Sequence, residues 1–233
     1  MNEYGISHDT IDKIYKLLNY THKLFKQKNI KYWATGGTLL GIRRHQNMIP
    51  WDDDIDISLF NNPQNIKNLD SIKSELKKNN YGLTKTFYGY KIFLLDGTPI
   101  KRNLWREHKA KFKKKNPSVK GRADISSGAS KTYKKSKKIL YEKYKYPFLD
   151  IFLANELDNK IVCKSNKWPK CYYNKEDLFP LKLYKYGKLK IYGAQNPDNY
   201  LNSCYGMDWK THGVIKYNHK LEKMIKEKKF IIK

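Results

Sequence analysis

Cysteine is scarce in this sequence, and long apolar runs are missing from it. The 233 residues include three cysteines, Cys163, Cys171 and Cys204. Their odd number and the absence of a C-x-x-C spacing argue against a disulfide framework or a zinc site, and this usage fits a reducing compartment best. No apolar stretch approaches the ~20 residues that a membrane helix requires, and the N-terminus lacks the apolar segment of a signal peptide. We therefore expect a protein without a transmembrane segment, in the cytoplasm or peripheral at a membrane surface.

Acidic residues are few beside basic ones. The sequence holds 48 Lys and Arg against 22 Asp and Glu, a formal net charge of +26. This excess favours a polyanionic partner such as nucleic acid, an anionic membrane or glycan surface, or a phosphate-rich small molecule. A solvated surface filled with Lys is an equal alternative, because Lys greatly outnumbers Arg and specific phosphate forks favour Arg.

The basic excess concentrates in residues 101–145. This segment has 17 Lys and Arg against three acidic residues. Its middle, residues 116–130, contains Gly and Ser and few large apolar side chains, which predicts a mobile loop. We interpret residues 101–145 as a basic Lys-rich insertion that could meet an anionic surface or polyanion.

The rest of the chain mixes helical and strand patterns. Apolar residues spaced three to four apart, with Ser7 or Asp9 as a cap, predict a helix over 7–29. Period-two alternation predicts a strand over 54–59, and an apolar run predicts another over 146–153. Further helices are expected at 38–44, 66–78, 199–205 and 217–229, and further strands at 31–35 and 83–95, the latter as a strand or hairpin.

Four carboxylates crowd into five positions, Asp52, Asp53, Asp54 and Asp56. Unpaired, they would repel one another, so such a cluster indicates a bound cation. Asp54 and Asp56 point to the same face of the predicted strand, which suits Mg²⁺, and Asp52 joins them if the extended backbone reaches back that far. Asp53 then faces away. A solvated turn is the alternative, and the apolar residues on both sides of the cluster count against it.

Asp150 is a lone acid within the apolar strand predicted over 146–153. A buried carboxylate needs a partner, and a metal ion shared with Asp54 and Asp56 would supply one. Pairing with one of the many lysines is the alternative.

A strand-to-helix turn is predicted at Gly36, Gly37 and Thr38, upstream of the carboxylates. Backbone N–H groups at such a helix start could cradle a phosphate. A pair of glycines more often marks only a tight turn, so the value of this motif comes from its place between two strands, one of which carries the acids.

Three further residues between this turn and the carboxylates are candidates for binding a substrate. Arg44 suits bidentate contacts with phosphate, and His45 is a weaker candidate. A surface loop is the alternative for both. Trp51 could wall the pocket, or it could be a core aromatic.

The stretch YWATGGTLLGIRRHQNMIPWDDDIDISLF, which begins at Tyr32, closely resembles the signature of the LicD/fukutin family. Two further stretches resemble that family more loosely: Leu149-Asp150-Ile151-Phe152, and Tyr200-Leu201 followed by Tyr205-Gly206-Met207-Asp208-Trp209. The resemblance covers about residues 7–213, but residues 101–145 have no counterpart in it. It implies an α+β, nucleotidyltransferase-like fold over 1–233, a single domain with a mixed β-sheet flanked by helices and the basic insertion.

The resemblance also implies an activity. The family contains transferases that move phosphocholine or ribitol phosphate from a CDP-linked donor to a glycan or glycoconjugate acceptor such as lipopolysaccharide, releasing CMP. By this resemblance, Asp54 and Asp56 would hold Mg²⁺, with Mn²⁺ as the alternative, against the donor diphosphate. Asp150 would be a further ligand or the base for the acceptor hydroxyl, and Asp52 is the other base candidate. Arg44 and the glycine amides would hold the donor phosphates.

Two other functions stay open from the sequence. A nucleotidyltransferase in the strict sense, which passes the nucleotide itself to a small molecule, protein or RNA, would use the same fold and metal site. A non-enzymatic protein that binds RNA or another polyanion would account for the charge. The sequence contains no RNA-recognition motif, helix-turn-helix or zinc finger in support of it.

Overall fold

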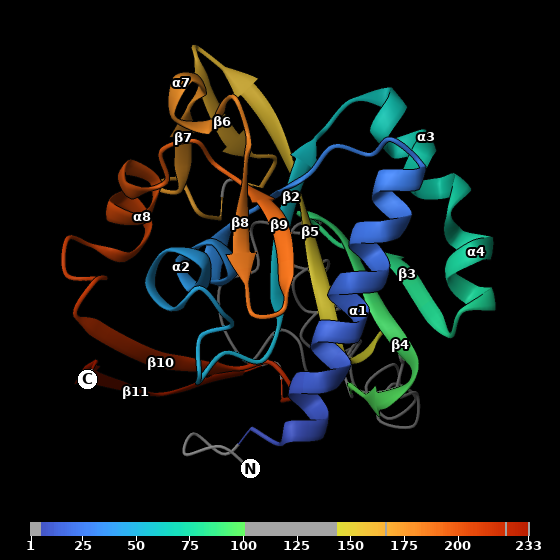
Figure 1. Ribbon diagram of the computed structural model, residues 1–233, viewed down its shortest axis with the longest axis horizontal. Coiled ribbons are helices and arrows are strands. Elements are labelled where there is room, and N and C mark those ends of the chain that lie inside the picture. Colours follow the sequence, from blue (N-terminus) through green and yellow to red (C-terminus); the bar gives the residue numbers. More distant parts are fainter. Residues whose placement is uncertain (1–5, 101–143, 166, 222, 233) are drawn as a thin grey trace, which may run out of the picture. The chain divides into compact units, whose positions relative to one another are not determined.

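The computed structural model of the chain describes residues 6–100, 144–165, 167–221 and 223–232 (Figure 1). The chain divides into two units, and the fold below is that of the unit formed by Met1–Thr98 and Tyr144–Lys233. Most of the predicted basic insertion, residues 101–143, lies outside the described residues. The insertion and the single domain expected over 1–233 therefore stay predictions.

A mixed β-sheet forms the centre of this unit. Its strand order is β1 (Trp33–Ala34), β2 (Ile55–Phe60), β5 (Lys145–Leu157), β4 (Gly89–Pro99) and β3 (Tyr81–Lys85), with β6 (Lys160–Cys163) on β5 and β7 (Tyr172–Asn174) on β6. The central pair β2 and β5 is parallel, whereas β1–β2, β3–β4, β5–β6 and β6–β7 are antiparallel. The expected α+β class, a mixed sheet flanked by helices, is confirmed.

Helix α1 (His8–Gln27) covers one face of this sheet and lies across its front in Figure 1. Ser7 caps the helix by accepting a hydrogen bond of 3.1 Å from the Thr10 N–H, as its sequence predicts. The apolar face of α1 belongs to the same core as the apolar side chains of β2 and β5, among them Ile57 and Ile151. Helices α3 (Pro63–Ser71) and α4 (Lys73–Lys78) replace the single helix expected over 66–78.

The opposite face of β5 carries a different set of side chains. Since side chains alternate along a strand, those at every second position share one face: Tyr146, Phe148, Asp150 and Phe152. In the parallel register Asp56 of β2 lies beside Asp150 of β5. The pairing of Asp56 with Asp150, 94 positions further along the chain, thus places two carboxylates on one face of the sheet.

Smaller elements complete this unit. Helix α2 (Gly36–His45) contacts β2 and β8, and the others are α7 (Lys175–Leu178), α8 (Asp198–Tyr205) and two hairpins, β8 (Lys182–Tyr186) with β9 (Leu189–Gly193) and β10 (His212–Asn218) with β11 (Lys223–Ile231). Helices α2 and α8 confirm the expectations for 38–44 and 199–205.

The helix expected over 217–229 is wrong, because this segment lies in the β10–β11 hairpin. The Asn218 side chain accepts a hydrogen bond of 2.8 Å from the Leu221 N–H and so stabilises the turn. Phe230 of β11 packs edge-on against Trp51, with ring centroids 4.8 Å apart. A tertiary contact of this kind overrides the helical preference of a Lys-rich segment.

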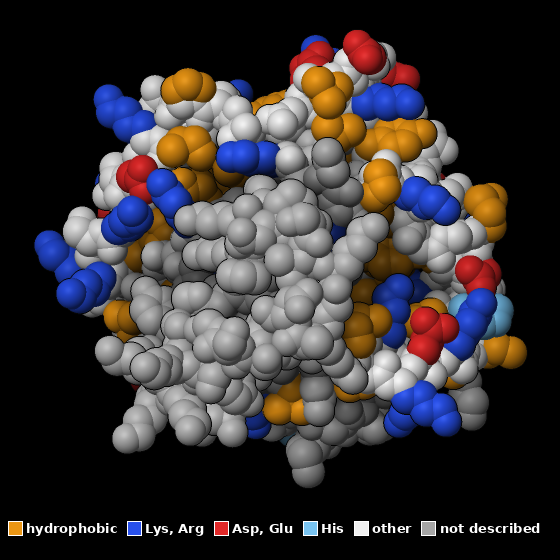
Figure 2. All heavy atoms as spheres, turned by 180° about the vertical axis from the view of Figure 1, so that it is seen from behind, with side chains coloured by type: hydrophobic (Ala, Val, Ile, Leu, Met, Phe, Trp, Pro, Cys, Tyr) orange, Lys and Arg blue, Asp and Glu red, His pale blue; other side chains and the backbone are white. Residues whose placement is uncertain are grey.

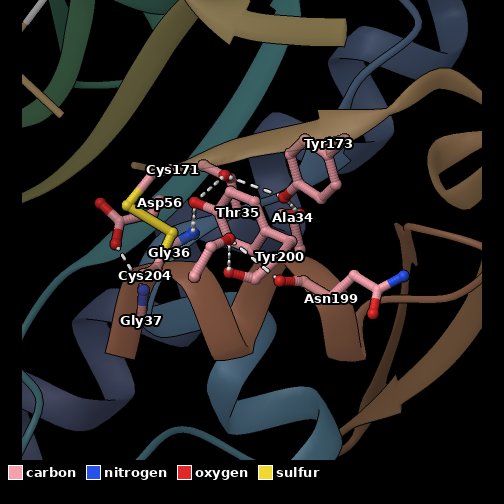
Figure 3. Close-up of a disulfide and its surroundings, with 11 residues drawn as sticks. Ala34, Thr35, Gly36, Gly37, Asp56, Cys171, Tyr173, Asn199, Tyr200 and Cys204 are labelled. Atoms are coloured by element: carbon pink, nitrogen blue, oxygen red, sulfur yellow. Dashed lines mark hydrogen bonds between the residues drawn. A yellow bond between two sulfur atoms is a disulfide. The ribbon is translucent and has the colours of Figure 1, made fainter. Parts of the chain in front are cut away.

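The expectation from the cysteines is also wrong. Cys171, just before β7, and Cys204 of α8 form a disulfide, while Cys163 is free (Figure 3). Cysteine usage therefore no longer supports a reducing compartment. Among the described residues, no helix has the length and apolar character needed to cross a membrane.

Candidate functional site

Three carboxylates meet where β2 and β5 run side by side. Asp54 lies directly before β2, Asp56 lies within it, and Asp150 is the register partner of Asp56 on β5. One oxygen from each carboxylate lies within 4.8 Å of the others. Asp54 and Asp150 are buried, with 4% and 6% of their surfaces exposed. The structure thus brings these side chains together, and their role as metal ligands stays a prediction.

The three carboxylates form a donor set that fits a divalent cation. Burial raises the pKa of Asp54 well above its usual range, and the charges of Asp52 and Asp150 add to this effect. Burial likewise raises the pKa of Asp56, together with the charges of Asp54 and Asp150. A hard cation bound by oxygen ligands would remove this penalty, so the residues present fit a metal ion such as Mg²⁺ or Mn²⁺.

Asp150 has two protein partners of its own. The Nζ atom of Lys91 lies 2.6 Å from Oδ1 and 2.8 Å from Oδ2, and the Tyr88 hydroxyl donates to Oδ1 at 2.7 Å. Lys91 is itself 4% exposed. The lysine pairing that the sequence leaves open for Asp150 is therefore confirmed, and a metal ion shared with Asp54 and Asp56 stays a prediction.

A second group of side chains adjoins the first at Asp54. His219, from the β10–β11 turn, uses Nδ1 to bond Asp53 and places Nε2 at 3.2 Å from Asp54. Tyr146 donates to the other Asp53 oxygen at 3.0 Å. The expectation that Asp53 faces away is therefore wrong. Burial lowers the pKa of His219, but the charge of Asp54 and the hydrogen bond to Asp53 outweigh it and raise the pKa well above its usual value.

His219 is a residue that the sequence analysis missed. It lies 166 positions from Asp53 in a Lys-rich segment, and a lone histidine there carries no local pattern. Only the hairpin that replaces the expected helix brings its ring to the carboxylates.

The two glycines at the start of α2 let carboxylates approach the helix closely. A Cβ on Gly36, whose φ is +52°, would collide with the carboxylate of Asp56, and a Cβ on Gly37 would collide with that of Asp52. Any side chain at either position would displace these acids. Burial raises the pKa of Asp52 to about 7, and the charges of nearby aspartates add to this while His219 opposes it.

The backbone N–H groups of this turn donate hydrogen bonds to other groups of the protein. The Gly37 N–H donates to Asp56 Oδ2 at 2.9 Å, and the Gly36 N–H donates to the Tyr200 hydroxyl at 3.1 Å. Thr38 Oγ1 accepts a hydrogen bond of 2.8 Å from the Asp56 N–H. The turn thus positions Asp56, and contacts of Gly36, Gly37 and Thr38 with a phosphate stay a prediction.

Two stacked tyrosines support this turn from the side of α8 (Figure 3). The rings of Tyr173 and Tyr200 lie 4.0 Å apart at 4°. Both hydroxyls bond Thr35 Oγ1, at 3.0 Å and 2.8 Å. The Cys171–Cys204 disulfide ties together the two segments that carry these rings. None of these supports was apparent from local sequence patterns.

Arg44 is in the last turn of α2, and its side chain reaches backbone oxygens at the start of the β10–β11 hairpin. Its Nη1 donates to the backbone oxygens of Trp209, at 2.6 Å, and His212, at 3.0 Å. Burial lowers its pKa to about 10. These contacts give Arg44 a structural role, and its contact with a donor phosphate stays a prediction.

Trp51 is the packing centre of the same region. The Arg44 guanidinium lies 5.1 Å from its ring centroid, and the His45 ring meets it edge-on at 5.7 Å. Burial and the charge of Arg44 lower the pKa of His45 to about 4. Trp51 therefore packs among protein groups, and the substrate contacts expected of Trp51 and His45 stay predictions.

The Lys and Arg side chains that the structure describes form no single patch on the face shown in Figure 2. Lys and Arg side chains of the described residues on that face are spread over its surface, with Asp, Glu and hydrophobic side chains among them. This distribution resembles a solvated surface more than a binding patch for a polyanion.

Comparison with known proteins gives one family match. Residues 29–102 match the family described as LicD/FKTN/FKRP, nucleotidyltransferase domain. Over 41 residues the chain is 51% identical to the lipopolysaccharide cholinephosphotransferase LicD of Haemophilus influenzae, covering 18% of the chain and 16% of that protein. Over 41 residues it is 39% identical to the human ribitol 5-phosphate transferase FKRP, covering 18% of the chain and 8% of that protein.

A longer relative covers almost the whole chain. An uncharacterised protein of Rickettsia prowazekii is 27% identical over 225 residues, which are 95% of this chain and 64% of that protein. The chain therefore spans less than two thirds of the length of this relative.

Proposed function

The chain belongs to the LicD/fukutin family, and on this premise we propose that it transfers phosphocholine or ribitol phosphate from a CDP-linked donor to a glycan-type acceptor. The meeting of Asp54, Asp56 and Asp150 on adjacent strands is the observation that carries this proposal. The description of the matching family supports a nucleotidyltransferase-like fold for this unit.

The carboxylates would hold a divalent metal ion. Asp54, Asp56 and one oxygen of Asp150 would be its ligands, and Mg²⁺ suits these hard donors, with Mn²⁺ as the alternative. When bound, the ion neutralises charge on the donor diphosphate. Phosphoryl transfer depends mainly on such positioning and charge compensation, so a rigid strand pair is an apt support for the ligands.

Two cations of the chain itself would assist. Lys91 offsets the charge of Asp150, and His219 offsets those of Asp53 and Asp54. Because both are held against carboxylates before a substrate arrives, little reorganisation is needed when the donor binds. Arg44 and the N–H groups of the α2 turn would face the donor phosphates.

The transfer itself exchanges one phosphorus–oxygen bond for another. The acceptor oxygen attacks the phosphorus that bears the alcohol, and the bond from that phosphorus to CMP breaks with its electrons leaving on CMP. The acceptor proton passes to a carboxylate. Asp150 is favoured for this role by its place on the sheet face, and Asp52 by its pKa of about 7.

CMP release tests the proposal. The chain is incubated with Mg²⁺ and either CDP-choline or CDP-ribitol, beside the variants Asp54→Asn and Asp56→Asn. Asp12→Asn, on the exposed surface of α1, is the matched control. We expect metal-dependent CMP release by the wild type and the control, and its loss in both site variants. Equal release by the site variants would contradict the proposal.

Transfer of the nucleotide itself is the second candidate, favoured by the nucleotidyltransferase description of the matching family. Mass spectrometry of the acceptor separates the two reactions. A gain equal to a phospho-alcohol supports the first candidate, and a gain equal to a nucleoside monophosphate supports the second.

A further inference from the structure

Four aromatic side chains form a cluster that the proposed chemistry has not used. Phe87 and Tyr88 come from the bend between β3 and β4, Phe152 from β5, and Trp168 from the connection between β6 and β7. Tyr88 stacks on Phe152 at 4.7 Å, Trp168 meets Phe152 edge-on at 5.4 Å, and Phe87 stacks on Trp168 at 6.2 Å. We call these four residues the aromatic cluster.

The aromatic cluster reaches the surface through three of its four members. Phe87 is 62% exposed, and Phe152 and Trp168 are half-buried, whereas Tyr88 is buried beside them at 8% exposure. By contrast, Trp33 in the aromatic group with Phe60 and Phe179 is 1% exposed. Exposed aromatic faces grouped in one place are typical of binding sites, because burying them against a ligand displaces water and lowers the free energy.

The aromatic cluster adjoins the carboxylates on the side of Asp150. Phe152 follows Asp150 by two residues on the same face of β5, about 7 Å along the strand. The Tyr88 hydroxyl donates to Asp150 at 2.7 Å. The α2 glycines lie instead against Asp56 and Asp52.

The site therefore has two flanks. The α2 glycines lie on the flank of Asp52 and Asp56, and the aromatic cluster lies on the flank of Asp150. In phosphoryl transfer the attacking and leaving oxygens lie roughly in line on opposite sides of the phosphorus. The proposed function assigns the donor phosphates to the α2 flank, so CMP would leave on that side. The attacking acceptor then approaches from the flank of Asp150, where the aromatic cluster lies.

We propose that the aromatic cluster is the acceptor subsite and that its ligand is a sugar ring. This inference rests on the proposed function. The C–H face of a pyranose packs on exposed aromatic rings while its hydroxyls stay free, so one of them can reach Asp150. Lys167 disfavours a cationic ligand, because its Nζ already lies 5.0 Å from the Trp168 ring centroid and 5.3 Å from that of Phe87. The choline head of a donor is therefore the poorer occupant.

Binding of simple glycosides tests the subsite without knowledge of the acceptor. Saturation-transfer NMR is recorded with the full chain and methyl glycosides of glucose, galactose and N-acetylglucosamine. The variants are Phe87→Ala and Trp168→Ala, and the control is Leu183→Ala, an equally exposed apolar residue of β8 at 54% exposure. We expect at least one glycoside to bind the wild type and the control, with affinity about five- to tenfold lower in both aromatic variants.

Calorimetry with CDP-choline and CDP-ribitol in Mg²⁺ separates this inference from the proposed function. Donor binding should be unchanged in Phe87→Ala. Because the Phe87 side chain is exposed, this variant should unfold at the same temperature as the wild type. Loss of donor binding in the aromatic variants would assign the cluster to the donor and overturn the inference. Glycoside binding that is absent from the wild type, or equal in all variants, would also overturn it. Absence of donor binding in the wild type would instead count against the proposed function.

Discussion

Two groups of carboxylates meet at Asp54, and each is compensated by a different kind of cation. Asp150 has the buried ammonium of Lys91 at 2.6 Å, held by a strand of the same sheet. Asp53 and Asp54 have the imidazole of His219, held by a hairpin turn. An imidazole changes its charge within the physiological pH range, so the His219 group should respond to pH as well as to mutation. The Lys91 group offers a test by mutation.

Removal of Lys91 should have the largest effect. Lys91→Met leaves Asp150 buried beside Asp54 without its cation, and loss of one partner of a buried pair costs about 3–5 kcal/mol. The free energy of unfolding by urea measures this. Lys175→Met, which breaks the half-exposed pair with Glu156, is the matched control and should change it by less than about 1 kcal/mol. Similar losses in the free energy of unfolding of both variants would contradict a larger contribution of the buried Lys91–Asp150 pair.

The disulfide beside the α2 turn offers a second test. The Cys171–Cys204 disulfide closes a loop with a sequence separation of 33, so Cys204→Ser should lower the free energy of unfolding by about 2–4 kcal/mol. A dithiol reductant should reproduce this loss in the wild type. Cys163→Ser is the control, because Cys163 is a free thiol. An unchanged unfolding midpoint after reduction would contradict a stabilising role for the bond.

The His219 group should depend on pH. Because the folded pKa of His219 is raised, its stabilising contribution is complete below about pH 6.5 and is lost as pH rises through the folded pKa. His219→Gln should therefore cost about 1–3 kcal/mol at pH 6 and less once the pH rises through the folded pKa of His219. Urea unfolding of both proteins across this range gives the comparison. A difference that grows with pH would refute the pairing.

The pH dependence of the metal-free site as a whole gives a further test. Asp52 has an ordinary pKa of 3.8 and a folded pKa of about 7, so folding binds a proton between these values. The free energy of unfolding should fall by a few kcal/mol as pH rises from about 4 to 7, since the buried acids must then ionise. Mg²⁺ should restore stability more at pH 8 than at pH 5, because a metal ion binds the ionised carboxylates. Thermal unfolding with Mg²⁺ or a chelator measures this.

Local sequence patterns predicted the strands that carry Asp56 and Asp150. The alternation around Asp54 and Asp56 predicted β2, and the lone acid in an apolar run predicted that Asp150 needs a partner. Both signals work because side-chain alternation is a property of the strand itself. The register that joins Asp56 to Asp150 belongs to tertiary structure, and only the structure shows it.

The positions of His219 and of the disulfide could not be predicted from local patterns, because they too depend on tertiary structure. His219 and the Cys171–Cys204 bond act through contacts between segments far apart in sequence. The Lys-rich pattern near 217–229 is compatible with a helix, and packing of Phe230 on Trp51 decides for a hairpin. Because a helix was expected over 217–229, the contact of His219 with the carboxylates was not predicted.

Calorimetric titration of CDP-choline and CDP-ribitol, with Mg²⁺ or with a chelator, tests the central claim most directly. The titrations use the wild type, Asp56→Asn and the control Asp12→Asn. We predict that one donor binds the wild type and the control only when Mg²⁺ is present, and that Asp56→Asn abolishes this binding. Donor binding that persists in the chelator or in Asp56→Asn would contradict a metal-dependent donor site at these carboxylates.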